Sequence, residues 1–187
     1  MKSHHLTLLL GGARSGKSAL ACSLASHCPA QSIIYVATAT AADPEMAERI
    51  RLHKLERPTD WRLLEAPLAL AEAIRQASQQ QTCLIVDCLT LWLSNLLHDE
   101  QGEPQPQESL EHHFQALEQA LISAPGRVIL VSNEVGLGIV PLGPLTRRFV
   151  DEAGRLNQRL ARLADRVLFV AAGLPLVLKG EEMTHHA

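Results

Sequence analysis

Short apolar runs alternate along this chain with longer segments of helical pattern. Runs of strand length lie at 6–10, 33–36, 83–86, 128–131 and 167–170, with shorter candidates at 61–65 and 175–178. The segments between them, at 19–27, 43–57, 68–78, 89–97, 109–123 and 145–164, are predicted helices. This alternation predicts an α/β fold with a mostly parallel central sheet and helices on both faces, the last strand being antiparallel. Ligands of such sheets bind at the carboxyl ends of the strands.

The bulk composition is that of one globular domain. The chain has 187 residues, of which 47% are hydrophobic and 20% charged, and we find no internal boundary within 1–187. A net charge of −3 and an aromatic content of 3% argue against a nucleic-acid partner. No apolar run approaches the roughly 20 residues of a membrane span. We expect a cytoplasmic protein whose four cysteines are reduced.

The loop after the first apolar run carries the strongest chemical signal. It reads GGARSGKS and fits the phosphate-loop pattern G-x-x-x-x-G-K-S/T between a strand and a helix. Glycines let the backbone N–H groups converge on a phosphate, Lys17 would reach the outer phosphates, and the Ser18 hydroxyl would ligate Mg²⁺. The chain is therefore predicted to bind a nucleoside triphosphate through Gly11, Gly12, Ala13, Arg14, Ser15, Gly16, Lys17 and Ser18.

Asp87 supplies the second half of such a site. It ends the apolar run at 83–86, and an acid at the carboxyl end of a neighbouring strand can hold the Mg²⁺ shell. Ser18 and Asp87 are the predicted metal-binding residues.

The predicted helix at 43–57 places Arg49, His53 and Arg57 at spacings of four residues. Two guanidinium groups beside an imidazole would disfavour its protonation, so His53 could act as a nucleophile or a base on a phosphate. On spacing alone, a solvated basic helix face is the more common explanation of this pattern.

The segment 132–144 follows a predicted strand and contains three glycines and two prolines. Long loops at this end of a strand usually carry function. Its Asn133-Glu134 pair differs from the N-K-x-D signature of regulatory GTPases, which argues against a switch GTPase.

Several motifs in order resemble one family. These are GGARSGKS, YVATA, DPEMAERIRLHKLERPTDW, VDCLTLWLSNLL and VSNEVGLGIVPLGPLTRRFVDEAGRLNQRLA. Together they look like the bifunctional adenosylcobinamide kinase / adenosylcobinamide-phosphate guanylyltransferase family of cobalamin biosynthesis, over roughly residues 6–179. The segments R-I-x-x-H-K-x-x-R-P and N-E-V-G-x-G-I-V-P carry the specificity of the match.

The resemblance implies a recombinase-like P-loop NTPase fold, a homotrimer and two reactions. The corrinoid adenosylcobinamide would be phosphorylated from ATP or GTP with Mg²⁺, and GMP would then pass from GTP to that phosphate. The family histidine that becomes guanylylated corresponds to His53. Leu52 stands where the family often has a second histidine. Besides the phosphate loop, the implied nucleotide contacts are Ala37, Thr38, Ala39, Lys54, Leu55, Glu56, Arg57, Glu65 and Asp87.

Two other functions compete with this interpretation. The chain could be a phosphate-loop kinase of another small alcohol, with His53 structural and no guanylyltransferase activity. It could also be a recombinase-like ATPase acting in an assembly, although the lack of a basic stripe weighs against that class.

Overall fold

A single mixed sheet organises the molecule. The computed structural model describes residues 5–40, 58, 60–98 and 102–181. The sheet has seven strands in the order β3-β2-β4-β5-β1-β6-β7. Strands β1 to β6 are parallel, and β7 pairs antiparallel with β6. In chain order the strands are β1 (Leu6–Gly11), β2 (Ser32–Ala37), β3 (Arg62–Glu65), β4 (Thr82–Asp87), β5 (Arg127–Asn133), β6 (Arg166–Ala171) and β7 (Leu174–Lys179).

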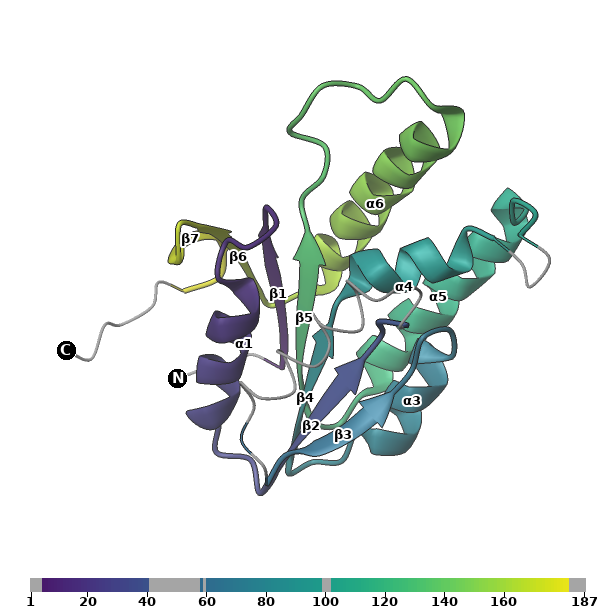
Figure 1. Ribbon diagram of the computed structural model, residues 1–187. Coiled ribbons are helices and arrows are strands. Elements are labelled where there is room, and N and C mark those ends of the chain that lie inside the picture. The colour runs from purple at the N-terminus through teal and green to yellow at the C-terminus, as the bar shows by residue number, and fades with distance from the viewer. Residues whose placement is uncertain (1–4, 41–57, 59, 99–101, 182–187) are drawn as a thin grey trace.

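Helices cover both faces of this sheet, but unequally in the described part of the chain (Figure 1). One face carries α1 (Lys17–Ser26). The other carries α3 (Leu70–Ala77), α4 (Leu89–Leu96), α5 (Gln107–Ser123) and α6 (Pro144–Leu163). The predicted α/β class, the parallel sheet and the antiparallel last strand are confirmed. Each predicted element within the described residues ends within two residues of the observed one, whereas the predicted helix 43–57 lies outside them.

The strands are continuous apolar runs because each side of the sheet is buried. In β1, Leu8 and Leu10 belong to the hydrophobic cluster under α3–α6, while Leu9 belongs to the cluster under α1. Successive side chains point to opposite faces, so a strand covered on both sides must be apolar at each position. All six residues of β1 are buried.

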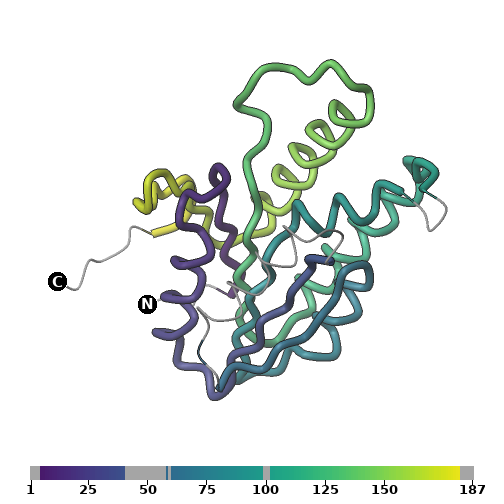
Figure 2. The backbone as a smooth tube through the Cα atoms, in the orientation of Figure 1, coloured from purple at the N-terminus to yellow at the C-terminus, as the bar shows by residue number. Residues whose placement is uncertain are grey.

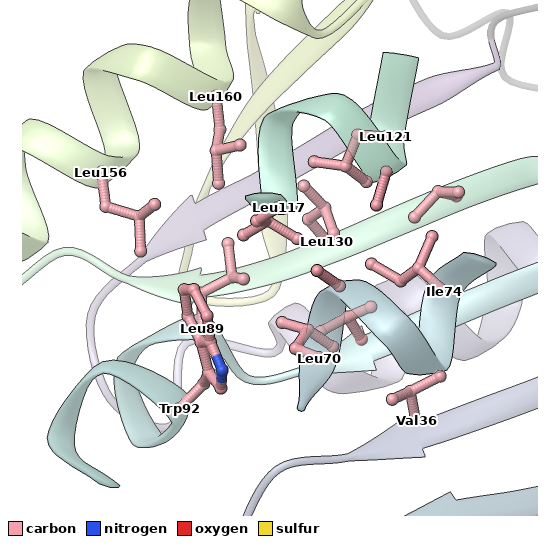
Figure 3. Close-up of a cluster of buried hydrophobic side chains, with 14 of the residues drawn as sticks. Val36, Leu70, Ile74, Leu89, Trp92, Leu117, Leu121, Leu130, Leu156 and Leu160 are labelled. Atoms are coloured by element: carbon pink, nitrogen blue, oxygen red, sulfur yellow. The ribbon is translucent and has the colours of Figure 1, made fainter. Parts of the chain in front are cut away.

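The larger cluster lies between the sheet and the four helices of one face (Figure 3). Its largest member is Trp92 of α4, which is 1% exposed and packs near Phe114 of α5. The indole N–H of Trp92 donates to the Leu68 carbonyl oxygen at 2.9 Å, so the buried ring leaves its polar atom satisfied. None of the described helices has the length and apolarity to cross a membrane.

A charged clamp joins α5 to α6 outside this core. The Arg159 guanidinium donates to Glu111 at 2.6 Å and to both carboxylate oxygens of Glu118 at 2.7 Å. It also lies over the Phe114 ring, 5.6 Å from the centroid. The Glu118 bonds raise the pKa of Arg159 further above its already high value. The clamp fixes α6, whose amino end leads back to the carboxyl edge of the sheet.

The cluster under α1 contains two neighbouring cysteines. All four cysteines are free thiols. Burial and the adjacent Cys28 thiol raise the pKa of Cys83 to about 12, so Cys83 stays protonated at neutral pH and packs as a small apolar side chain.

The carboxyl ends of the six parallel strands lie along one side of the sheet, which we call the carboxyl edge. The backbone trace shows the segment between β5 and α6 arching away from that edge (Figure 2). Residues 134–143 form this segment, in which Ile139 is 98% and Leu142 97% exposed.

Gly126, just before β5, lies where the amino ends of the parallel strands are tightly packed. A Cβ at this position would lie 2.3 Å from the Gln79 carbonyl oxygen and 2.7 Å from that of Thr82. We expect Gly126→Ala to lower the free energy of unfolding by about 2 kcal/mol, because the backbone must shift. The control Gly154→Ala lies in the interior of α6 with open space around it, and should raise stability by about 0.5–1 kcal/mol. Urea unfolding measures both, and equal stability of the two variants would contradict the packing.

Candidate functional site

The predicted phosphate loop connects β1 to α1 and is packed against the turn between β6 and β7. A Cβ on Gly11 would lie 2.3 Å from the Val170 carbonyl oxygen, so only glycine fits there. Gly16 precedes α1 with φ 99°, a left-handed conformation that favours glycine. The Gly173 N–H donates to the Ser15 carbonyl oxygen at 2.8 Å, which fixes the loop to the β6–β7 turn.

Lys17 opens α1 and is only 5% exposed. Its ammonium donates to the Gly12 carbonyl oxygen at 2.6 Å and lies 3.4 Å from the Ser15 hydroxyl oxygen. Burial lowers the pKa of Lys17, and the nearby Asp87 carboxylate opposes that shift. The structure thus holds a partly desolvated positive charge inside the curl of the loop.

The rest of the loop is arranged around this charge. Gly12, Ala13 and Arg14 are exposed at its tip, whereas Ser15, Gly16 and Ser18 are half-buried. The first turn of α1 contains no acidic residue. No acidic side chain in that turn therefore opposes an anion beside the Lys17 ammonium, and phosphate binding at this helix start stays a prediction.

Asp87 ends β4, two strands away from β1 in the sheet. The Tyr35 hydroxyl donates to its Oδ2 at 2.7 Å, which orients the carboxylate. Mg²⁺ prefers oxygen ligands and usually takes one or two carboxylates together with substrate phosphates and water. The Ser18 hydroxyl and the Asp87 carboxylate fit that ion, and the described residues contain no cluster of three His, Cys, Asp or Glu side chains that would suit a different metal.

Other predicted contacts lie farther along the same edge. Ala37 ends β2 and Glu65 ends β3, and the two pair across adjacent strands. Neighbouring strands are about 4.8 Å apart, so Glu65, four strands from Gly11, lies about 19 Å away from the phosphate loop. The structure therefore brings Lys17 and Asp87 together and places Ala37 and Thr38 beside Asp87 on the adjacent strand. Ala39 follows Thr38, and Glu65 lies one strand farther from the phosphate loop.

Thr38 has a structural role that the sequence did not reveal. It is completely buried, and its hydroxyl donates to the Cys88 carbonyl oxygen at 2.7 Å. Its N–H donates to the Asp87 carbonyl oxygen, and its own carbonyl oxygen accepts from Asn95 at 2.8 Å. These bonds tie the end of β2 to Asp87 and Cys88.

Sequence reasoning missed the residues that support the site, chiefly Tyr35, Thr90 and Asn95. A usable signal was present, because α4 reads LTLWLSNL and is apolar except at Thr90, Ser94 and Asn95. Polar side chains in a helix buried on the sheet must find partners, and here those partners lie at the carboxyl edge.

The predicted nucleophile falls outside the described residues. His53 lies there together with Arg49, Lys54, Leu55, Glu56 and Arg57, so the proposed alignment on one helix face stays a prediction.

Comparisons with known proteins identify the relatives of the chain. A family model described as cobinamide kinase / cobinamide phosphate guanyltransferase matches residues 7–178. The bifunctional adenosylcobalamin biosynthesis protein CobP of Pseudomonas aeruginosa is 53% identical over 176 residues, covering 94% of this chain and 98% of the relative. The corresponding protein CobU of Escherichia coli is 40% identical over 182 residues, covering 93% and 99%.

Solved structures agree on the fold. An ATPase from a bacterial type III secretion system aligns with TM-score 0.53 and 14% identity, over 92% of this chain and 56% of that one. The flagellar accessory protein FlaH of Methanocaldococcus jannaschii aligns with TM-score 0.51 and 13% identity, over 95% and 79%. Both alignments agree with the seven-stranded, mostly parallel sheet flanked by helices and confirm the predicted α/β fold class.

Lys17→Met tests whether the loop binds phosphates through its buried charge. We expect triphosphate binding with Mg²⁺ to weaken at least about tenfold, because a charge-assisted hydrogen bond is lost. Thermal stability should not fall, because burial already disfavours the charged ammonium. Lys179→Met, which removes an ammonium bonded to the Ala161 and Arg162 carbonyl oxygens far from the loop, is the matched control. Calorimetric titration that gave both variants the wild-type affinity would contradict the assignment.

Proposed function

The chain belongs to the cobinamide kinase / cobinamide phosphate guanyltransferase family, and we propose that it carries out both reactions of that family. It phosphorylates the aminopropanol hydroxyl of adenosylcobinamide from ATP or GTP. It then transfers GMP from GTP to that phosphate, releasing pyrophosphate. The structural observation that supports this most is the buried Lys17 ammonium inside a glycine loop, facing the same edge as Asp87.

The kinase step relies on positioning and charge. The loop amides and Lys17 hold the phosphates of the nucleotide, and Ser18 and Asp87 are the residues that would hold Mg²⁺. When bound, Mg²⁺ neutralises charge that develops on the transferred group. Tyr35 keeps the Asp87 carboxylate oriented through its Oδ2. No covalent enzyme intermediate is needed, because the alcohol oxygen can attack the γ-phosphorus directly.

The guanylyltransferase step uses His53 as nucleophile. A bond forms from the neutral imidazole nitrogen to the α-phosphorus of GTP as the bond from that phosphorus to the pyrophosphate oxygen breaks. A phosphate oxygen of adenosylcobinamide phosphate then attacks the same phosphorus, and the P–N bond breaks. Arg49 and Arg57 stabilise the negative charge on the transferring group. The support for this step is the R-I-x-x-H-K-x-x-R-P segment and the family match.

The ends of β2 and β3 contact the nucleoside part of a nucleotide, with the buried Thr38 acting through its bonds to Asp87 and Cys88. Glu65 lies four strands from Gly11, too far along the edge to share the phosphates held by Lys17. Ala37 and Thr38 lie beside Asp87 on the adjacent strand, and Ala39 follows them. Lys54, Leu55, Glu56 and Arg57 complete this part of the site in our proposal.

The arching segment 134–143 provides the corrinoid surface. Its Glu134 N–H donates to the Gly11 carbonyl oxygen at 2.9 Å, so the segment starts directly beside the phosphate loop. Leu137, Ile139, Val140 and Leu142 are exposed along it. A corrin ring offers a broad, largely apolar face, and an exposed apolar segment next to the phosphates suits such a substrate.

The assembly and the compartment are part of the proposal. Homotrimer formation follows from the resemblance, and the exposed leucines of β7, Leu174, Leu176 and Leu178, give it apolar surface to bury. Sedimentation equilibrium should give the mass of three chains, and a monomer mass would refute the homotrimer.

We also propose that the chain acts in the cytoplasm. Four free cysteines and nucleotide substrates fit that compartment.

His53→Ala tests the covalent step. We expect intact-mass measurement after incubation with Mg²⁺ and GTP to show a GMP-sized increase for the wild-type chain and none for His53→Ala, while phosphorylation of adenosylcobinamide persists. His27→Ala, an exposed histidine at the end of α1, is the control and should form the adduct. An adduct on His53→Ala, or none on the wild type with bound nucleotide, would overturn the mechanism.

The corrinoid surface is tested by Ile139→Ser combined with Leu142→Ser. The loss of apolar contact should raise the KM for adenosylcobinamide by about tenfold or more, since burying each such side chain contributes about 1.5–3 kcal/mol. Formation of the GMP adduct should be unaffected. Ile122→Ser removes an equally apolar, 62% exposed side chain from α5 and should leave the KM unchanged. A KM that moves equally in both variants would show that the segment has no special role.

A further inference from the structure

Asn133 lies in the middle of the sheet's carboxyl edge, and neither of the two proposed reactions gives it a role. It ends β5, the strand between β1, which leads into the phosphate loop, and β4, which ends at Asp87. Asn133 pairs with Gly11 in the sheet register. The next residue, Glu134, donates its N–H to the Gly11 carbonyl oxygen. Asn133 is therefore level with the start of the phosphate loop.

The amide of Asn133 is oriented by Thr90. Its Nδ2 donates to the Thr90 hydroxyl oxygen at 2.9 Å, and its backbone N–H lies 3.4 Å from the same oxygen. Thr90 is 4% exposed and lies in the first turn of α4, two residues after Cys88 and three after Asp87. One hydroxyl thus connects the end of β5 to the segment that follows the predicted Mg²⁺ ligand.

Thr90 is itself held in place by the side chain of Cys88. Its hydroxyl oxygen is 3.1 Å from the Cys88 Sγ. The Cys88 carbonyl oxygen accepts from Thr38, which extends the network to β2. Cys88, Thr90 and Asn133 thus form a connected network between the end of β5 and the end of β4.

This arrangement leaves the oxygen end of the Asn133 amide for another partner. The NH₂ end is directed at Thr90, and no donor from the described residues bonds to Oδ1. An amide oxygen only accepts hydrogen bonds. It would be repelled by phosphate oxygens but suits an O–H group that approaches them.

We propose that Asn133 Oδ1 accepts the hydrogen bond of the acceptor hydroxyl in the kinase step and that Thr90 is the positioning residue for this amide. The inference rests on the proposed function, which requires an alcohol beside the γ-phosphate. The alcohol oxygen forms a bond to the γ-phosphorus as the bond from that phosphorus to the β–γ bridging oxygen breaks. The nucleoside diphosphate leaves with the electron pair, and the alcohol proton passes to water. Asn133 orients the oxygen and takes no proton, because an amide is not a base at neutral pH.

The test compares Asn133→Ala, Thr90→Val and Thr90→Ser with the wild-type chain. Asn133→Ala should lower the kinase kcat about a hundredfold, since misplacing a reacting group costs that order of rate. Thr90→Val keeps the shape but removes the hydroxyl and should lower kcat about tenfold, whereas Thr90→Ser should restore most of it. The dissociation constant of Mg²⁺-GTP and the GMP adduct on the enzyme should stay at wild-type values in all three.

Thr82→Val is the matched control. Thr82 is another buried threonine, at the amino end of β4, whose hydroxyl bonds only the Gln79 backbone in the described structure. It should lower thermal stability and leave the kinase kcat unchanged. This separates loss of a buried hydroxyl in general from loss of the one that orients Asn133.

The possible outcomes distinguish failure of the Asn133 role from failure of the proposed kinase function. If the wild-type chain phosphorylates adenosylcobinamide but Asn133→Ala and Thr90→Val do so at wild-type kcat, the role of Asn133 is wrong and the function stands. If kcat and Mg²⁺-GTP affinity fall together in Thr90→Val and Thr90→Ser does not restore them, the network only maintains the fold. If the wild-type chain phosphorylates no corrinoid, the proposed function fails, and the orienting role assigned to Asn133 fails with it.

Discussion

The site depends on one close approach: the phosphate loop packs against the β6–β7 turn with no space for a side chain at its first glycine. The Val170 carbonyl oxygen occupies the place of a Cβ on Gly11, and Gly173 bonds the loop at Ser15. This contact fixes where β1 ends and where α1 begins. The position of Lys17 and the direction of the helix N–H groups follow from it.

A second consequence is a charge held in the protein before any ligand arrives. The Lys17 ammonium is buried and satisfied mainly by a carbonyl oxygen of its own loop, and burial lowers its pKa. Such a group is disfavoured in the folded chain unless an anion joins it. Without an anion the buried charge thus lowers the stability of the loop. By contrast, α5, α6 and the Arg159 clamp stabilise the far side of the sheet. Binding sites commonly show this division between a strained site and a stable scaffold.

Much of this could be predicted from the sequence because the signals were local. The apolar runs gave the strands, since a strand buried on both faces must be apolar throughout. The phosphate loop was readable because its glycines and lysine are contiguous. The pairs that complete the site were not readable. Tyr35 and Asp87 are 52 residues apart, and Thr90 and Asn133 are 43 apart. Their contacts depend on strand order and register, which periodicity alone does not specify. The same applies to Thr38, which the family resemblance assigns to the nucleotide and whose hydroxyl donates to the Cys88 carbonyl oxygen just after the neighbouring strand β4.

The most direct test of the central claim follows the corrinoid itself. Adenosylcobinamide is incubated with the wild-type chain, Mg²⁺ and GTP, and its mass is followed with time while pyrophosphate is assayed. The account predicts that adenosylcobinamide phosphate forms first and is then converted into adenosylcobinamide-GDP with release of pyrophosphate. Accumulation of the phosphate alone, or an unmodified corrinoid beside bound nucleotide, would contradict it.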